Sequence, residues 1–404
     1  MIKCNKLFFS AIFAFLCTLS FSAPIYSPSW GFSVDLPEGY TYTGGDGKDN
    51  FSFENPDGAK FDLIVYHAAA GKSAPANLEA LGRDTQSRLN NKGEINSFEY
   101  RQKKALIIEL SFSSPGGGGP GTAGRFYPME GWALCLELGI PNSGQKPGAA
   151  GQTNPKPLLL AMAYGPAGKK ELQTLHFSAL DSIAPDFSDR LAPGPITEFS
   201  YPRETRVRSP VFGLDLGAMI FKEDAEAAQA LVNREFQVLT RYANAPNWQE
   251  AWIRFYRAIY RDSFDRLADI AFQVERKFNV PAREERDFAN EVLRWVQTFK
   301  YERDLMGSDF QNIVTAAVEG RGDCDSRSML WAIIMKQAGI RSAIMVSRHY
   351  SHAMGLADLP GAGAHFEVEG QKLLVAETTS KVSIGLIGET VSEIEHWLGI
   401  TFDD

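Results

Sequence analysis

Apolar and polar residues alternate along much of the chain between about residues 25 and 185, a pattern typical of strands with one buried face. It predicts strands in six segments: 31–36, 51–53, 61–66, 105–112, 132–138 and 158–164. Asn-Pro-Asp-Gly at 55–58 predicts a hairpin turn between the second and the third. Helices are expected at 77–89 and 169–182. This mixture predicts an α+β sandwich in which helices cover one side of a single sheet.

Helical spacing replaces the alternation in the middle of the chain. The polar, proline-bearing stretch at 191–210 is expected to be a linker, and Asp224 is expected to cap a helix over 225–243. The next stretch, 248–278, carries apolar residues near helical spacing: Trp252, Phe255, Tyr256, Ile259, Tyr260 and Leu267. We interpret this face as a helix–helix core or a surface packed on the C-terminal part of the chain, with a ligand groove as the alternative.

The C-terminal part opens with helices and continues with strands. Pro281 suits the first turn of a helix, and the apolar residues that follow share one helical face: Phe288, Val292, Trp295, Val296 and Phe299. A second helix is expected over 326–338, ended by Gly339 at its C′ position. Strands are predicted in four segments: 342–347, 353–357, 364–368 and 372–376.

Length and composition indicate a multidomain globular protein. A chain of 404 residues is too long for one ordinary core. We expect a signal peptide at 1–23, an α+β sandwich domain at 24–190, a linker and helical region at 191–280 and a second α+β domain at 281–404. The apolar share of 44% and the charged share of 22% argue against a disordered chain. A net charge of −8 without a basic run argues against nucleic acid as a partner.

The N-terminus resembles a secretory signal in composition. Lys3 and Lys6 precede an apolar run over 7–21, and Phe-Ser-Ala at 21–23 offers a cleavage site. The run is shorter than the roughly 20 residues that a membrane span needs. We therefore expect an exported protein, periplasmic or secreted, with no transmembrane span after signal removal. A lipid anchor at Cys17 is the alternative.

Signal removal leaves two of the four cysteines, Cys135 and Cys324. Cys135 lies in an alternating stretch, where a cysteine is usually a small packing residue. An exported protein can join two cysteines in a disulfide. Because the two sequence contexts are unrelated, we expect two free thiols instead, of which Cys324 is the reactive one.

Cys324 combines features of a nucleophile. It lies in Gly-Asp-Cys-Asp at 322–325, where a glycine-rich turn leads into an apolar helix that Asp323 is expected to cap. The first turn of a helix lowers the pKa of a thiol. Asp323 and Asp325 act in the opposite direction, so an imidazolium partner would be needed to stabilise the thiolate. Gly320 and Gly322 would let main-chain N–H groups approach a substrate carbonyl.

His352 and Glu377 are the candidate partners of the thiol. His352 begins the strand region after the cysteine helix, and Glu377 ends a strand 25 residues later. The imidazole could act as the general base, and the carboxylate could accept a hydrogen bond from its second nitrogen. His365 stays open as an alternative base and Asp358 as an alternative acid, whereas His349 is expected to be exposed.

The order of a helix-borne cysteine, a strand-borne histidine and an acid at a strand end resembles the transglutaminase-like superfamily of papain-type cysteine enzymes. The similarity covers roughly 282–388. It rests on Trp-Val-Gln-Thr-Phe-Lys-Tyr at 295–301, on the cysteine motif with its helix, on His352 and on Glu-Thr-Thr at 377–379. The outline of the N-terminal domain resembles the PsbP/Mog1 type of α/β sandwich, as a pattern only.

The transglutaminase-like resemblance implies a papain-like catalytic domain at the C-terminus. Cys324 would be the nucleophile, His352 the base and Glu377 the ring-orienting acid, at a position where many relatives carry aspartate. Gln297, on the preceding helix, would be an oxyanion donor; a packing or surface glutamine is the alternative.

The implied activity is acyl transfer from an amide through a thioester on Cys324. With water as the acceptor the protein would be a peptidase or amidase acting on protein or peptide substrates. Transglutaminase-type transfer to an amine is one alternative, and a non-catalytic scaffold that binds envelope proteins is another. The N-terminal domain could contact a cell-envelope partner. No cofactor is expected, since neither a tetrahedral set of zinc ligands nor a nucleotide-binding glycine motif occurs in the sequence.

Overall fold

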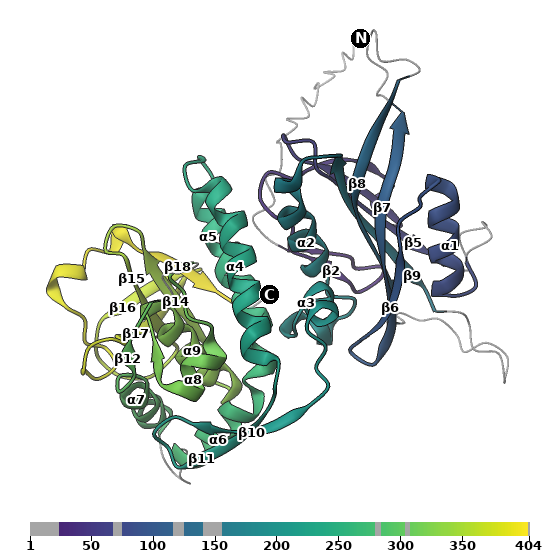
Figure 1. Ribbon diagram of the computed structural model, residues 1–404. Coiled ribbons are helices and arrows are strands. Elements are labelled where there is room, and N and C mark those ends of the chain that lie inside the picture. Colours follow the sequence, from purple (N-terminus) through teal and green to yellow (C-terminus); the bar gives the residue numbers. More distant parts are fainter. Residues whose placement is uncertain are drawn as a thin grey trace, which may run out of the picture.

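The computed structural model describes residues 24–67, 75–115, 125–139, 156–278, 284–303 and 308–402. The structure is mixed α and β, with two large antiparallel sheets and long helices between them (Figure 1). The predicted signal peptide and the helix start at Pro281 lie outside the described residues.

The N-terminal sheet has seven strands in the order β3-β4-β5-β9-β8-β7-β6. Their bounds are β3 Thr41–Gly45, β4 Asn50–Glu54, β5 Lys60–Tyr66, β6 Ile95–Tyr100, β7 Lys103–Pro115, β8 Phe126–Glu137 and β9 Leu158–Pro166; the short strands β1 Ile25–Tyr26 and β2 Ser33–Val34 pair separately. The predicted hairpin between β4 and β5 is confirmed. Asn55 stabilises its turn by accepting hydrogen bonds from the backbone N–H groups of Asp57 and Ala59.

Helices cover both faces of this sheet. Helix α1 (Leu78–Leu89) packs on one face and α2 (Gln173–Asp181) on the other (Figure 1). The predicted arrangement, with helices on one side only, is therefore wrong. The reason lies in strands such as β7, where Ile107 contributes to the core under α2 and Ile108 to the core under α1. A strand that is apolar on both faces needs a cover on each.

The stretch predicted as a linker is ordered. It contains helix α3 (Pro195–Ser200) and strand β10 (Arg206–Val211), which pairs with β11 (Leu216–Phe221). The side chain of Asp181, at the end of α2, accepts hydrogen bonds of 2.8 Å from the backbone N–H groups of residues 196 and 197 and so caps α3. The prediction of a linker is wrong because the capping side chain, Asp181, belongs to another helix and lies outside the segment from which the prediction was made.

In the described residues from 224 to 337 the helices are α4 Asp224–Tyr242, α5 Trp248–Arg266, α6 Ala268–Phe278, α7 Glu285–Val296, α8 Ile313–Glu319 and α9 Cys324–Gln337. The stretch predicted as one helix over 248–278 is thus divided at Leu267. Asp224 is the first residue of α4 and does not cap it. Its carboxylate accepts from the backbone of Phe221 at 2.8 Å and from Arg266 at 2.7 Å, which corrects the predicted role.

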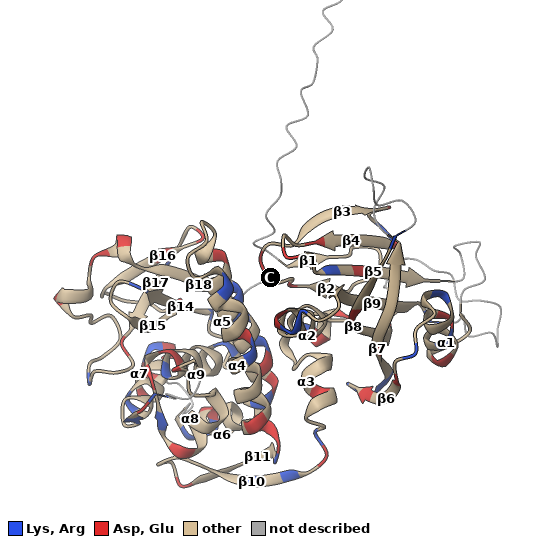
Figure 2. Cartoon of the chain, turned by 45° about the horizontal axis from the view of Figure 1, so that its top comes forward, with Lys and Arg blue, Asp and Glu red and all other residues tan. Residues whose placement is uncertain are grey.

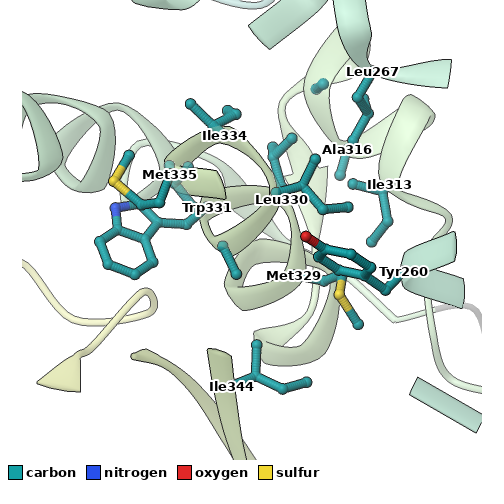
Figure 3. Packing of buried hydrophobic residues seen from close by; sticks show 14 of the residues in the cluster. Tyr260, Leu267, Ile313, Ala316, Met329, Leu330, Trp331, Ile334, Met335 and Ile344 are labelled. Carbon is teal, nitrogen blue, oxygen red and sulfur yellow. The ribbon is translucent and has the colours of Figure 1, made fainter. Parts of the chain in front are cut away.

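The C-terminal sheet has five antiparallel strands in the order β16-β17-β15-β14-β18. They are β14 Ser342–Ser347, β15 His352–Ala357, β16 His365–Val368, β17 Gln371–Ala376 and β18 Leu398–Thr401. Helix α9 is buried against β14 and β15, with side chains of α5, α8 and β14 around it (Figure 3). The helix is followed by Gly339 at a φ of +82°, as predicted for a C′ glycine.

Helix α5 joins the two halves of the molecule (Figure 1). Three of its arginines contact the N-terminal half: Arg254, Arg257 and Arg261. The guanidinium of Arg254 is buried 2.8 Å from Glu235 of α4 and 3.3 Å from Glu38. Figure 2 shows acidic and basic residues close together along α4 and α5. Three aromatic residues of α5, Phe255, Tyr256 and Tyr260, belong to the core around α9.

Replacing Arg254 with alanine is expected to lower the free energy of unfolding by about 3–5 kcal/mol, since buried Glu38 would lose the guanidinium that pairs with it and buried Glu235 would keep only Arg234. Arg294→Ala is the matched control. This arginine forms an exposed pair with Glu291, and such pairs contribute about 0.2–1 kcal/mol. Urea unfolding followed by tryptophan fluorescence measures both. Equal losses in the two variants would contradict the assigned role of Arg254.

Candidate active site

Cys324 is the first residue of α9. It follows β13 (Arg321–Gly322), which pairs in parallel with β12 (Lys300–Tyr301). The carboxylate of Asp323 accepts hydrogen bonds from the backbone N–H of Ser326 at 2.8 Å and from its hydroxyl at 2.7 Å. The prediction that Asp323 caps the helix and that Cys324 lies in its first turn is confirmed.

The two glycines before the cysteine are needed for packing. Gly320 ends α8 at a φ of +65°, and a Cβ there would overlap the ring of Phe212. A Cβ on Gly322 would overlap the hydroxyl of Ser326. The Gly322 carbonyl accepts a hydrogen bond of 3.1 Å from the buried guanidinium of Arg327. Both glycines thus fix the path of the chain into Cys324.

His352 and Glu377 form a hydrogen-bonded pair. His352 begins β15, Glu377 follows the end of the adjacent strand β17, and His352 Nε2 lies 2.8 Å from Glu377 Oε2. The other carboxylate oxygen accepts from the backbone and hydroxyl of Thr379, at 2.7 and 2.6 Å. Burial raises the pKa of Glu377, but the hydrogen bonds and the charge of His352 outweigh it and hold this pKa below its usual value. Because Nε2 of His352 bonds Glu377, the other ring nitrogen, Nδ1, is the one that could exchange a proton with another group.

The start of α9 is attached to the strands that carry this pair. The main chain of Ala353, the residue after His352, lies near enough to the Cys324 thiol to lower its pKa, although less than burial and the neighbouring carboxylates raise it. Ser328, one turn into α9, donates to the Ala353 carbonyl at 3.1 Å and lies 3.0 Å from the hydroxyl of Thr378. The first turns of α9, which carry Cys324, therefore pack against the residues that directly follow His352 and Glu377.

Two carboxylates surround the thiol. Cys324 Sγ donates to Asp325 Oδ2 at 3.4 Å, and the other Asp325 oxygen accepts from the Tyr256 hydroxyl at 2.5 Å. Burial raises the pKa of Cys324 above its usual value, and Asp325 and Asp323 raise it further. Burial and Asp325 likewise raise the pKa of Asp323 to about 8. Of the two opposing effects expected from the sequence, that of the carboxylates prevails over that of the helix terminus, and burial acts in the same direction as the carboxylates.

Gln297 lies directly after α7 and is buried. Its side-chain NH₂ donates to the carbonyl of Glu377 at 2.8 Å and to that of Val382 at 2.9 Å. Both N–H bonds of the amide are thereby used. In this arrangement Gln297 positions the segment that carries Glu377, and its amide does not point at a substrate oxygen.

The alternative residues lie away from the thiol. His365 is exposed, bonds the Gly363 carbonyl, and is paired through Leu374 with Ala357, at the far end of β15 from His352. Asp358 follows Ala357 and is exposed. His349 is exposed, as expected from the sequence.

Tyr256 and Trp397 also contact residues of the site, and no motif in the sequence indicates either contact. Tyr256 lies 69 positions before Asp325 on the aromatic face of α5. Most of that face is core, as with Phe255 and Tyr260, while the Tyr256 hydroxyl reaches the site. The ring of Trp397 lies 6.1 Å from that of His352.

Cys135 and Cys324 are both free thiols. Cys135 is buried in the N-terminal sheet, and burial raises its pKa to about 12. Among the described residues, no helix is both long and apolar enough to cross a bilayer. The described residues also contain no group of three or more His, Cys, Asp or Glu side chains that could hold a metal ion.

Asp325→Asn is expected to lower the pKa of Cys324, because it removes the negative charge 3.4 Å from the sulfur. At pH values below the Cys324 pKa of both the parent and the variant, each unit by which this pKa falls raises the thiolate fraction about tenfold. Nucleophilicity falls with pKa, so alkylation should accelerate about three- to fourfold per unit. Iodoacetamide rates at Cys324, resolved by mass spectrometry over a pH series, test this. Asp358→Asn, an exposed site at the far end of β15, is the control, and an unchanged rate in Asp325→Asn would contradict the assignment.

Comparison with known proteins adds little to this geometry. No family model matches the chain, and no curated protein matches it. A crystal structure from Bacteroides thetaiotaomicron VPI-5482 is 11% identical over 58% of this chain and 76% of that one, with a TM-score of 0.24. A candidate protease from Parabacteroides distasonis ATCC 8503 is 8% identical over 80% of this chain and 42% of that one, with a TM-score of 0.20. Likenesses at these TM-scores carry no argument about fold or activity.

Proposed function

We propose that the chain is an exported, transglutaminase-like cysteine enzyme that cleaves amide bonds of proteins or peptides. The observation that carries the proposal is the hydrogen bond of 2.8 Å between His352 and Glu377, next to a cysteine at a helix start. A nucleophile, a base and a group that orients the base are the parts that acyl transfer through a thioester requires. The resemblance of the sequence to papain-type enzymes points the same way.

The proposed reaction has two stages. His352 Nδ1 takes the thiol proton while Cys324 Sγ bonds to the amide carbon, and Glu377 stabilises the imidazolium. The C–N bond then breaks, and the imidazolium gives its proton to the leaving amine. In the second stage His352 takes a proton from water, whose oxygen attacks the thioester carbon. The C–S bond breaks, the acid is released, and the proton returns to sulfur.

The raised pKa of Cys324 shapes this mechanism. Burial, Asp325 and Asp323 all raise the pKa of Cys324, so the proposed mechanism starts from the neutral thiol. The proton is transferred to His352 during attack on the carbonyl, as in general-base catalysis.

The negative oxygen that develops on the substrate needs hydrogen-bond donors. The side-chain N–H bonds of Gln297 are already used. The first N–H groups of a helix have no acceptor within the helix, so we assign this role to the main-chain N–H of Cys324.

A non-catalytic scaffold is the second candidate, and one observation favours it: Cys324 is only 2% exposed. A thiol that no substrate reaches would make the site structural. The two candidates differ in whether small acylating reagents modify Cys324.

The product separates hydrolysis from transfer to an amine. Incubation with casein and a fluorescent primary amine is expected to give casein fragments without incorporated label. Label incorporation without fragments would contradict the peptidase and support a transglutaminase. Neither product, together with a thiol inert toward acylating reagents, would contradict the enzyme and support the scaffold.

A further inference from the structure

A cavity of about 330 Å³ lies beside the candidate active site. Its lining includes three indoles, two imidazoles and one guanidinium, from α5, from the turn after β14 and from the segment that enters β18: Trp248, Trp252, Trp397, His349, His396 and Arg348. None of these side chains has a role in the acyl-transfer steps above. A small concave site lined mostly by rings is typical of a pocket for one ligand group.

The walls of this aromatic pocket are arranged in pairs. Trp248 and Trp252 meet edge to face with ring centres 5.6 Å apart. His349 and His396 stack with ring centres 4.0 Å apart and planes 17° apart. The guanidinium of Arg348 lies 5.7 Å from the ring centre of Trp248. The pocket thus offers ring faces and ring edges, the surfaces that another aromatic ring prefers to contact.

Two lining residues of the aromatic pocket contact residues of the candidate active site. Trp252 contacts Tyr256 at 6.3 Å between ring centres, and the Tyr256 hydroxyl binds Asp325, the residue that holds the thiol proton. On the other side, Trp397 lies 6.1 Å from His352. A group bound in the pocket would therefore lie next to an amide held at Cys324.

Size and charge restrict the occupant. Ligand sites usually measure about 300–1,000 Å³, so a cavity of about 330 Å³ suits a single side chain. Arg348 and Glu395, of opposite charge, both line it, which argues against a charged group. The rings favour an aromatic group over an aliphatic one of similar area.

From these contacts we infer that the aromatic pocket binds a neutral aromatic side chain of the peptide substrate, adjacent to the bond that Cys324 attacks. The inference rests on the proposed function for the statement that the bound side chain lies next to a cleaved bond. Binding in the pocket itself does not need catalysis. It makes Trp252 and His349 specificity-determining residues.

Binding to the full-length Cys324→Ala protein tests the inference without turnover. The probes are capped Gly-Phe-Gly and Gly-Leu-Gly tripeptides, titrated by isothermal calorimetry. The phenylalanine peptide is expected to bind about 2- to 12-fold more tightly, the range that a ring–ring contact adds beyond burial. Trp252→Ala should remove the preference. His349→Ala, at an exposed position, should reduce it, whereas His365→Ala, an exposed histidine elsewhere, should leave it unchanged.

The outcomes separate this inference from the proposed function. Equal binding of the two peptides, or a preference that survives both Trp252→Ala and His349→Ala, would overturn the pocket assignment even if the parent protein cleaves casein. A preference for the phenylalanine peptide that is lost in both variants would support the pocket assignment. If the parent protein at the same time cleaves nothing, only the acyl-transfer proposal would be contradicted.

Discussion

The Cys324→Ala protein is expected to lose amide cleavage by at least about 10³-fold. The thioester cannot form without the sulfur, and what remains is the effect of binding and of the oxyanion donors alone. Release of fragments from fluorescently labelled casein, with far-UV circular dichroism to confirm folding, measures the loss.

Cys135→Ala is the matched control for this experiment. It removes the other free thiol, which is buried in the N-terminal sheet. Full activity in Cys135→Ala and none in Cys324→Ala would assign the reaction to one sulfur. Equal activity in the parent and in Cys324→Ala would show that any cleavage comes from another group.

Glu377→Gln is expected to lower the rate by about 10²–10⁴-fold, the usual contribution of general-base catalysis. Thr379 donates two hydrogen bonds to Glu377 Oε1, so in glutamine the carbonyl oxygen would stay there and the NH₂ would face His352 Nε2. The imidazole would then carry its proton on Nδ1, the nitrogen that must accept the proton of the thiol. The base would be present in the wrong tautomer.

Glu367→Gln makes the same substitution at an exposed residue of β16 and should leave the rate of amide cleavage unchanged. Glu377→Asp should retain more activity than Glu377→Gln, because a carboxylate still accepts from Nε2. Casein cleavage by the four proteins, measured at equal concentration, tests the series. A rate for Glu377→Gln equal to that of Glu367→Gln would exclude Glu377 from the mechanism.

Local chemistry explains which parts of the structure could be predicted. Helix α9 was predicted from an N-cap at Asp323, an apolar run and a C′ glycine at Gly339, all within one segment. The pairing of His352 with Glu377 was inferred from the order of elements, and the structure places their side chains within hydrogen-bond distance.

Contacts between distant segments explain what could not be predicted. The cap that orders α3 comes from Asp181, and the hydroxyl that binds Asp325 comes from Tyr256 in another helix. The two N–H bonds of Gln297 are used by carbonyls 80 and 85 positions away. The pKa of Cys324 depends on burial as well as on its neighbours in sequence, and burial appears only in the folded chain.

Acylation by p-nitrophenyl acetate reports on the nucleophile itself, since it needs no natural substrate. We expect a burst of p-nitrophenol of one equivalent and an acetyl group on Cys324 by peptide mass mapping, with Cys135 unmodified. The burst should be absent in Cys324→Ala and slower by about 10²-fold or more in His352→Ala and Glu377→Gln. An unmodified Cys324, or acetylation at the same rate in the parent and in His352→Ala, would show that Cys324 is not a nucleophile activated by His352.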